Sequence, residues 1–349
     1  MMKVSVVGCG NISKTHLPIL QSLPGIEISS VVDIKPERAD LAGEKYGCRV
    51  FYDFDAMLAA DRPDSIHICT PHYLHTEMAV KALENSINVL CEKPCAITKG
   101  EIAALKEAAS KSSALFGVCF QNRYNACVKK AKEIIESKKF GALVAQSGRV
   151  SWFRDKAYYS DDWHGKRATE GGGVLVNQAI HTADLLRYLS GSEVKSVCGH
   201  VFNDSLEGII EVEDTASVRY EFENGVIAVL NATNAFAFNA DVSIELYFES
   251  GDKLYIEGAQ LYHFEKDGTV TRLTDRQSAA SGGKSYWGNG HAALIEDFYR
   301  CIREKSHFPI DAFEGTKASE EFLAVYDSAK SGKSVRLTVF GNGNKVDFN

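Results

Sequence analysis

Three polar residues, Asn177, His181 and Asp184, interrupt the apolar run EGGGVLVNQAIHTADLLRYL at residues 170–189, and the first two are four residues apart. Its apolar residues recur at helical spacing, and we predict a helix over 177–189. Side chains four residues apart project from one face of a helix. An amide beside an imidazole can hold a hydroxyl group and accept its proton, so this pair is a candidate for acid–base chemistry. The alternative is a buried helix in which both side chains are hydrogen-bonded core residues.

A second candidate site is the glycine-rich segment GCGNIS, residues 8–13, which follows a predicted strand over 3–7. A strand, a glycine turn and a helix suit the pyrophosphate of a dinucleotide, because the helix N-terminus offers free N–H groups and a positive dipole end. Ser13 replaces the third glycine of the usual motif and is still small. We expect the cofactor to contact Gly8, Gly10, Asn11 and Ile12.

The next predicted strand, over 26–32, ends in Asp33. A carboxylate roughly twenty residues past the glycine loop can accept hydrogen bonds from the adenosine ribose. It would repel a 2′-phosphate, which favours NAD over NADP. Lys35 and Arg38 follow closely and keep NADP open, and a turn or cap role for Asp33 is the alternative.

Strands and helices alternate through the first 122 residues, which predicts a doubly wound parallel sheet, a Rossmann fold. Ligands of such sheets bind at the carboxyl ends of the strands. Five polar residues are predicted at those ends, namely Thr70, His75, Glu92, Lys93 and Gln121.

From about residue 142 the pattern changes to strands joined by short turns, at 144–153, 194–202, 215–222, 225–233, 242–248 and 253–256. This predicts an α+β domain with a large, mostly antiparallel sheet, covered on one face by the helix at 177–189. The sheet is also a ready surface for a homodimer or homotetramer. A Ser/Gly-rich loop over 278–290 carries Tyr286 and Trp287, for which sugar stacking and core packing are equal alternatives.

We therefore predict an NAD(P)-binding domain over 1–122 and a substrate-binding and oligomerisation domain over 123–349. Two helices, near 291–304 and 314–331, close the chain, and the last helix and tail are candidates to pack back on the first domain.

Composition narrows the class of protein. The chain has 349 residues, 45% hydrophobic and 24% charged, with a net charge of −7, which gives no electrostatic footprint for nucleic acid. No apolar run approaches the length of a membrane span, and the start lacks a signal-peptide pattern. Nine scattered cysteines without a CxxC pair fit reduced thiols, so we expect a cytoplasmic protein with no structural metal site.

Several motifs together resemble the glucose–fructose oxidoreductase/inositol dehydrogenase (Gfo/Idh/MocA) family. They are GCGNIS with Asp33, CTPHYLH, CEKP, QNRYN, GGGVLVNQAIHTADLL and YWGNGH, in the family's order. The resemblance implies a two-domain NAD(P)-dependent oxidoreductase acting on sugars, inositols or nucleotide sugars. It implies that Lys93 lies beside nicotinamide and substrate and that His181 transfers the proton. It also implies that Glu92, Thr70, Pro71 and His75 hold the nicotinamide half.

The chain departs from the family where many members carry Asp and Gly in place of Asn177 and Ala179. An Asn can bond a sugar hydroxyl but cannot act as a carboxylate base. Relatives resembling nucleotide-sugar dehydrogenases often have this Asn, with a preceding segment like YYSDDWHG at 158–165. For Arg123, a bond to the substrate and a domain-bridging salt link are equal alternatives. The expected substrate-binding residues are Lys93, Arg123, Trp163, Asn177 and His181.

The leading hypothesis is an NAD-dependent dehydrogenase that oxidises a secondary alcohol of a sugar-like substrate to a ketone. His181 would take the hydroxyl proton, and Lys93 would stabilise alkoxide character in the transition state or act as the base itself. One rival is a non-catalytic sensor that binds NAD and a sugar. Another is a redox enzyme with a tightly held cofactor that shuttles between two sugars.

Overall fold

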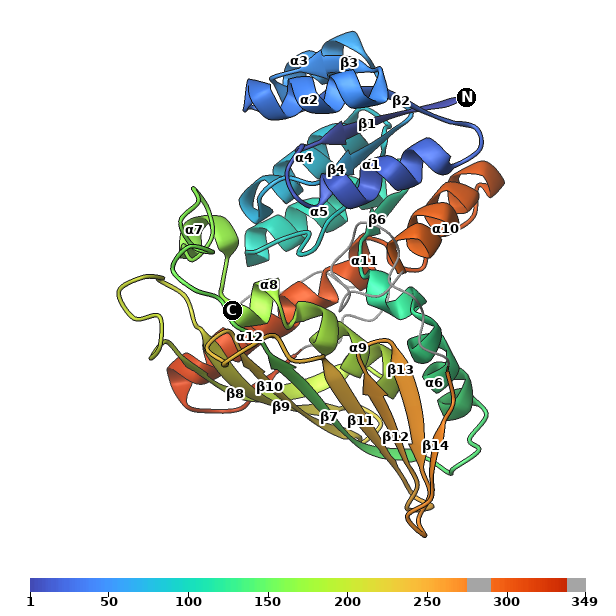
Figure 1. Ribbon diagram of the computed structural model, residues 1–349, viewed down its shortest axis with the longest axis vertical. Coiled ribbons are helices and arrows are strands. Elements are labelled where there is room, and N and C mark those ends of the chain that lie inside the picture. Colours follow the sequence, from blue (N-terminus) through green and yellow to red (C-terminus); the bar gives the residue numbers. More distant parts are fainter. Residues whose placement is uncertain (275–289, 338–349) are drawn as a thin grey trace.

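The computed structural model describes residues 1–274 and 290–337. Its first half contains a six-stranded parallel sheet in the order β3-β2-β1-β4-β5-β6 (Figure 1). The strands are β1 (Met2–Val7), β2 (Ile26–Val32), β3 (Arg49–Phe51), β4 (Ser65–Ile68), β5 (Asn88–Cys91) and β6 (Phe116–Val118). The predicted doubly wound sheet is confirmed.

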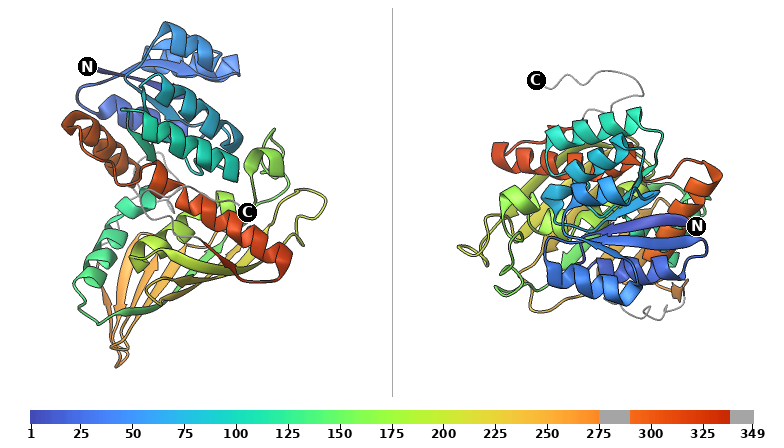
Figure 2. Two further views of the ribbon diagram at one scale, coloured as in Figure 1. Left: turned by 180° about the vertical axis from the view of Figure 1, so that it is seen from behind. Right: turned by 90° about the horizontal axis from the view of Figure 1, so that it is seen from above.

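Helices cover both faces of this sheet (Figure 2). They are α1 (Ser13–Ser22), α2 (Pro36–Tyr46), α3 (Phe54–Ala60), α4 (His72–Glu84) and α5 (Lys99–Lys111). Strand β1 pairs with β2 on one side and β4 on the other, so the strand order reverses there. Such a switch point opens a crevice at the carboxyl ends of the strands, where dinucleotides bind.

The second half contains a nine-stranded sheet in the order β14-β13-β12-β11-β7-β10-β9-β8-β15. All neighbours in this sheet are antiparallel except β10 and β7, which confirms a mostly antiparallel sheet. The strands are β7 (Leu143–Ser151), β8 (Val194–Phe202), β9 (Thr215–Phe222), β10 (Ile227–Thr233), β11 (Ser243–Phe248), β12 (Lys253–Glu257), β13 (Gln260–Phe264), β14 (Val270–Arg272) and β15 (Val335–Arg336).

Most of the remaining helical segments lie on one side of the large sheet or between the two sheets, whereas α10 lies beside α1 against the first sheet (Figure 1). They are η1 (Gln121–Tyr124), α6 (Ala126–Glu136), α7 (Arg167–Glu170), α8 (Val174–Asn177), α9 (Ile180–Ser190), α10 (Gly290–Glu304), α11 (Ala312–Gly315) and α12 (Lys317–Ser331). Helix α10 buries Leu294 and Phe298 in the hydrophobic core of the first domain, whereas α12 packs along β8 and also touches α5. The boundary at residue 122 stays a prediction.

None of the described helices is long and apolar enough to cross a membrane. The predicted loop at 278–290, with Tyr286 and Trp287, lies outside the described residues except for Gly290.

A buried ion-pair network links η1, α9, α11 and α12. Arg123 on η1 donates from Nε to Asp184 on α9 at 2.8 Å and lies 2.9 Å from Glu314 on α11. Arg187 on α9 lies 2.7 Å from Glu314 and 3.2 Å from Glu321 on α12. Because these groups are removed from water, each charge depends on its partners.

Asp184→Asn is therefore expected to lower the free energy of unfolding by about 3–5 kcal/mol, because it leaves buried Arg123 short of a counter-charge. Urea unfolding measures the change. Asp327→Asn is the matched control, since its exposed pair with Lys99 is worth at most about 1 kcal/mol. Equal losses in the two variants would contradict a stabilising role for the network.

Candidate active site

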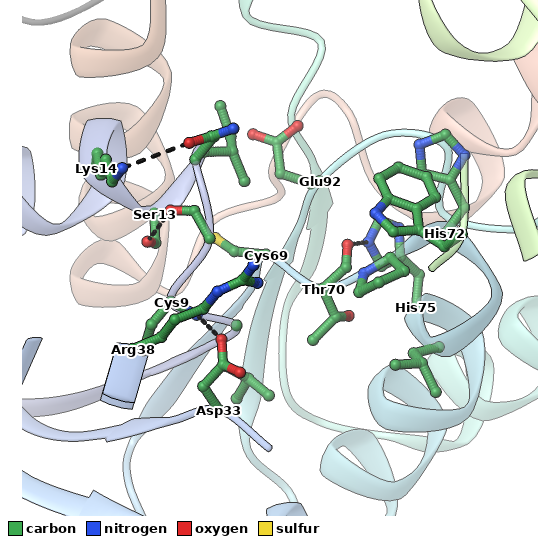
Figure 3. Close-up of a pocket in the computed structure, with 18 of the residues that line it drawn as sticks. Cys9, Ser13, Lys14, Asp33, Arg38, Cys69, Thr70, His72, His75 and Glu92 are labelled. Carbon is green, nitrogen blue, oxygen red and sulfur yellow. Dashed lines mark hydrogen bonds between the residues drawn. The ribbon is translucent and has the colours of Figure 1, made fainter. Parts of the chain in front are cut away.

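A cavity of about 760 Å³ opens at the carboxyl ends of the parallel strands (Figure 3). It is lined from one side by the first domain and from the other by the segment around β7, α7 and α8. The structure brings together nearly all the predicted site residues in its wall, namely Gly8, Gly10, Asn11, Ile12, Asp33, Thr70, Pro71, His75, Glu92, Lys93, Gln121, Trp163, Asn177 and His181. The roles of these residues stay predictions.

The glycine loop has the geometry that a dinucleotide phosphate needs. Gly8 has a φ of +94°, and a Cβ there would lie 2.6 Å from the carbonyl oxygen of Cys69, so no other residue fits. A Cβ on Gly10 would meet no protein atom within 4 Å, which leaves room for a ligand. Helix α1 starts at Ser13 without a side-chain cap, so N–H groups at its N-terminus remain available to an anion.

Asp33 is held at the end of β2 by two backbone amides. Its carboxylate accepts from the N–H of Cys9 at 2.8 Å and from the N–H of Lys35 at 2.9 Å (Figure 3). A carboxylate has about four acceptor positions, so it can still accept from ribose hydroxyls. The Lys35 ammonium lies 2.9 Å from Asp162 in the segment before α7. These residues fit the adenosine half of NAD.

Asp33→Ala is expected to raise the ratio of kcat/KM for NADP to that for NAD by about 10-fold or more, since it removes a ribose acceptor and a repulsive charge. Steady-state kinetics with both cofactors measure the ratio. Asp40→Ala removes an equal charge from exposed α2, outside the cavity, and is the control. A wild-type enzyme that already uses both cofactors equally would contradict this role.

The predicted single helix over 177–189 is wrong at one point, because it breaks into α8 and α9 after Asn177. The amide of Ala179 bonds to the carbonyl of Val174 at 2.7 Å, a wider turn than that of an α-helix. In a continuous helix the Asn177 carbonyl would accept from the His181 amide. Here it accepts from Nζ of Lys93 at 2.8 Å, and the break therefore fixes the Lys93 side chain.

The glycine triplet before α8 is required by close packing. A Cβ on Gly172 or Gly173 would lie 1.9 Å from the Tyr326 hydroxyl or from the Glu213 carbonyl oxygen. The triplet thus lets α8 approach its neighbours and places Asn177 beside Lys93. The amide of the Asn177 side chain donates to Glu170 at 2.5 Å and to Tyr158 at 3.3 Å.

The pKa values of His181 and Lys93 are both lowered from their usual values. Burial, followed by the charge of Lys93, lowers the pKa of His181 well below its usual value, so the imidazole is neutral at pH 7. Its Nδ1 is buried without a hydrogen-bond partner in the part of the chain described. Burial also lowers the pKa of Lys93, against the opposing charges of Glu92 and Glu170. A neutral imidazole and a partly buried lysine therefore line the same cavity, Lys93 from the end of β5 and His181 from α9.

Glu92 belongs to a buried hydrogen-bond chain. Its Oε1 lies 2.9 Å from Nε2 of His16, whose Nδ1 is 2.7 Å from Nδ1 of His67, and His67 Nε2 is 2.8 Å from the Tyr299 hydroxyl. The ligand atoms of His16, Glu92 and His291 all lie within 4.8 Å of one another, a spacing that could suit a metal.

The protonation of His16 disfavours a metal at this trio. Burial lowers its pKa, but Cys69, Cys119 and Glu92 outweigh burial and raise it well above the usual value. Burial raises the pKa of Cys119 to about 12, so this thiol is uncharged at pH 7, whereas Glu92 places a carboxylate 2.9 Å from Nε2 of His16. An imidazolium donates from both nitrogens, to His67 and to Glu92, and has no lone pair for a metal. We interpret the contact between His16 and Glu92 as an ion pair that orients the Glu92 carboxylate.

Two further predicted residues have structural partners. The ring nitrogens of His75 lie 2.7 Å from the carbonyl oxygens of Pro94 and Thr70, so His75 ties two cavity loops together. Gln121 is buried in the wall. Arg123, in contrast, does not line the cavity, and its charge is matched by Asp184 and Glu314. Of the two roles considered for Arg123, a substrate contact and a salt link, the structure shows the salt link.

Sequence reasoning left out several residues of the cavity wall. They are His72, Trp152, Arg154, Tyr158, His164, Gln178 and His291. The segment YYSDDWHG pointed toward Tyr158 and His164, since tyrosines and a histidine cluster there. Nothing in the local sequence marked Arg154, which lies in the segment that follows β7.

A glycine loop with an adjacent ribose acceptor, beside a lysine and a neutral histidine, defines an NAD-dependent oxidoreductase. Residues 2–120 match the model of an oxidoreductase family with an NAD-binding Rossmann fold, GFO_IDH_MocA, and residues 128–252 match the GFO/IDH/MocA C-terminal domain. The chain belongs to the Gfo/Idh/MocA family.

Relatives of known name support this class. The chain is 26% identical over 355 residues to D-glucoside 3-dehydrogenase of Escherichia coli, covering 96% of this chain and 97% of the relative. It is 24% identical to scyllo-inositol 2-dehydrogenase (NAD(+)) of Bacillus subtilis, covering 97% of each. The crystal structure of the WlbA dehydrogenase from Bordetella pertussis, in complex with NADH and UDP-GlcNAcA, superposes with a TM-score of 0.84 at 26% identity. That match covers 97% of this chain and 99% of the other.

Proposed function

We propose that this protein oxidises a secondary hydroxyl of a sugar, inositol or nucleotide sugar to a ketone with NAD. The observation that carries the proposal is that neutral His181 and partly buried Lys93 line the same cavity as the glycine loop. Bound NAD supplies the acceptor for the hydride. The residues of the chain must then bind the hydroxyl, orient it and remove its proton.

His181 is the proposed base. A neutral imidazole can accept the hydroxyl proton directly, and it needs no prior deprotonation at pH 7. Lys93 is the proposed electrostatic partner. Its ammonium, held by the Asn177 carbonyl, can donate a hydrogen bond to the reacting oxygen as negative charge develops there. Burial strengthens that interaction, because little water screens it.

Glu92 and Asn177 are proposed as positioning residues. The charge of Glu92 opposes the burial of Lys93 and favours its ammonium form. Asn177 contributes its carbonyl to Lys93 and its side-chain amide to Glu170. Thr70, Pro71 and Trp163 complete the wall on the nicotinamide and substrate side. The relatives' names, a glucoside and an inositol dehydrogenase among them, support a polyhydroxylated substrate.

The test is NADH formation by purified protein mixed with NAD and a panel of free sugars, inositols and nucleotide sugars. Steady NADH release with at least one of them is expected. Binding of NAD and a sugar without turnover would contradict the proposal and favour a sensor. A protein-bound NADH signal that a second sugar discharges would instead favour a shuttle with tightly held cofactor.

We also propose a cytoplasmic homo-oligomer that assembles through the large sheet. The sheet face away from α9 exposes Ile227, Val229 and Tyr247, which fits a covered surface better than a solvated one. All nine cysteines are free thiols, as a reducing compartment favours. Light scattering of the purified protein, compared with a Val229→Glu variant, tests the assembly; a monomeric wild type would contradict it.

A further inference from the structure

One buried cation in the cavity wall, Arg154, has no acidic partner among the residues that the structure describes. Three arginines are buried in the described residues, Arg123, Arg154 and Arg187. Arg123 and Arg187 are paired with carboxylates of the ion-pair network. Arg154 is only 8% exposed, yet it makes no ion pair with any residue that the structure describes.

The polar contacts of Arg154 satisfy only part of its guanidinium. Nη1 donates to the Phe153 carbonyl at 2.6 Å and to Oδ1 of Asn239 at 2.8 Å, whereas Nε is buried without a hydrogen-bond partner. The group lies over the rings of Trp152 and Tyr158, 5.0 Å from each centroid. These contacts orient the cation but do not neutralise it.

The nearby carboxyl groups are already engaged. Asp161 lies 2.6 Å from Nδ1 of His164. Glu170 accepts from the Gly165 amide and from Asn177, and burial raises its pKa to about 8, so it is largely uncharged at pH 7. A buried arginine without a counter-charge is costly unless a ligand supplies one.

Arg154 also lies within reach of the proposed reaction centre. It packs on Tyr158, whose hydroxyl accepts from Asn177, and Asn177 in turn holds Lys93. The site is separate from the glycine loop, which belongs to the other wall of the cavity. An anion at Arg154 would therefore belong to the substrate and not to the cofactor pyrophosphate.

We propose that Arg154 is the anion-binding residue of the substrate site, and that the substrate is a sugar bearing a carboxylate or phosphate group. This inference rests on the proposed function. The planar guanidinium can bind either anion with two parallel hydrogen bonds, and stacking on Trp152 and Tyr158 keeps it in one orientation.

The test is calorimetric binding to the NADH-loaded protein of glucose, glucuronate and glucose 6-phosphate, with galactose and galacturonate as a second matched pair. At least one anionic sugar is expected to bind the wild type about 10-fold or more tightly than its neutral counterpart. Arg154→Met should reduce that preference to about 2-fold or less and leave NADH affinity unchanged. Arg154→Lys keeps the charge and loses the bidentate geometry, so its preference for the anionic sugar should lie between those of the wild type and Arg154→Met.

Arg167→Met removes an equal charge from exposed α7, outside the cavity, and should keep the preference. Glucuronate and glucose 6-phosphate distinguish a carboxylate from a phosphate. The inference is overturned if the wild type binds no anionic sugar more tightly than the neutral one, or if Arg154→Met retains the preference. Tight binding of an anionic sugar without NADH formation by any sugar would uphold the anion site and contradict the proposed function.

Discussion

Lys93→Met is expected to lower kcat by about 10²–10⁴-fold, the range for a positioned acid–base or electrostatic group. Methionine keeps most of the length of the side chain and removes its charge. The loss should appear in kcat, because the hydrogen bond to the reacting oxygen strengthens as that oxygen becomes negative. The measurement is initial-rate kinetics with the best substrate from the panel, with NADH affinity from fluorescence titration.

NADH affinity should change little in Lys93→Met, since the proposed contacts to adenosine and phosphate are those of Asp33 and the glycine loop. Lys99→Met is the matched control, because Lys99 is an exposed residue of α5 whose ammonium pairs with Asp327. Near-normal turnover in Lys93→Met would remove Lys93 from the mechanism. A large rise in KM with unchanged kcat would show that Lys93 binds the ground state and the transition state equally and does not speed the chemical step.

The fold was largely predictable because its signals are local. The strands β2, β8 and β9 have the predicted bounds, since each is a regular pattern between turn residues. Helices α3 and α6 and the strands β13 and β14 were not predicted. The first two are short amphipathic segments, and β14 is a three-residue edge strand that gains its order from pairing with β13.

The candidate site was predictable where a chemically suitable residue stands at the end of a predicted strand. Gly8 and Asp33 follow directly on strands of the parallel sheet, and Lys93 is the second residue after β5, so strand prediction alone places them at one edge. The break after Asn177 was not predictable in this way, because the apolar periodicity continues across it. It depends on the packing of Gly172 and Gly173 against Tyr326 and Glu213, residues distant in sequence.

Arg123 and Arg154 also show that local sequence does not reveal partners that are distant along the chain. Arg123 follows a predicted strand end and was a candidate for the substrate, whereas Arg154 received no role. Their difference lies in distant partners, since Asp184 and Glu314 neutralise Arg123 and no described carboxylate does so for Arg154. Charge compensation across the fold cannot be read from local sequence.

His181→Asn is expected to lower kcat and also to remove the fall of the oxidation rate at low pH, which we call the acid limb of the pH profile. In the wild type, the rate of alcohol oxidation should fall at low pH as His181 becomes protonated and can no longer accept a proton. Since the pKa of His181 lies well below 6.5, that limb should lie on the acid side of the ordinary imidazole range. The variant should lose the limb, with kcat reduced by about 10²–10⁴-fold and substrate affinity changed far less.

Asn177→Ala is the comparison variant, since it removes an amide that binds Glu170 and Tyr158 but leaves the imidazole in place. It should weaken substrate binding by about 0.5–1.5 kcal/mol and keep the acid limb. Asn177→Asp should be tolerated with neutral sugars and should do worst with anionic ones, because the new charge repels them.

The charges around His181 provide a second test of its assignment as the base. Burial and Lys93 lower its pKa, His291 lowers it further, and Glu92 opposes them. Lys93→Met removes one of the lowering charges, so the acid limb that remains in that variant should move to higher pH, toward 6.5. Profiles of kcat against pH for the wild type, His181→Asn and Lys93→Met measure all three expectations. If His181→Asn retained the wild-type limb, the titrating base would be another group, and Lys93, whose pKa burial also lowers, would become the base.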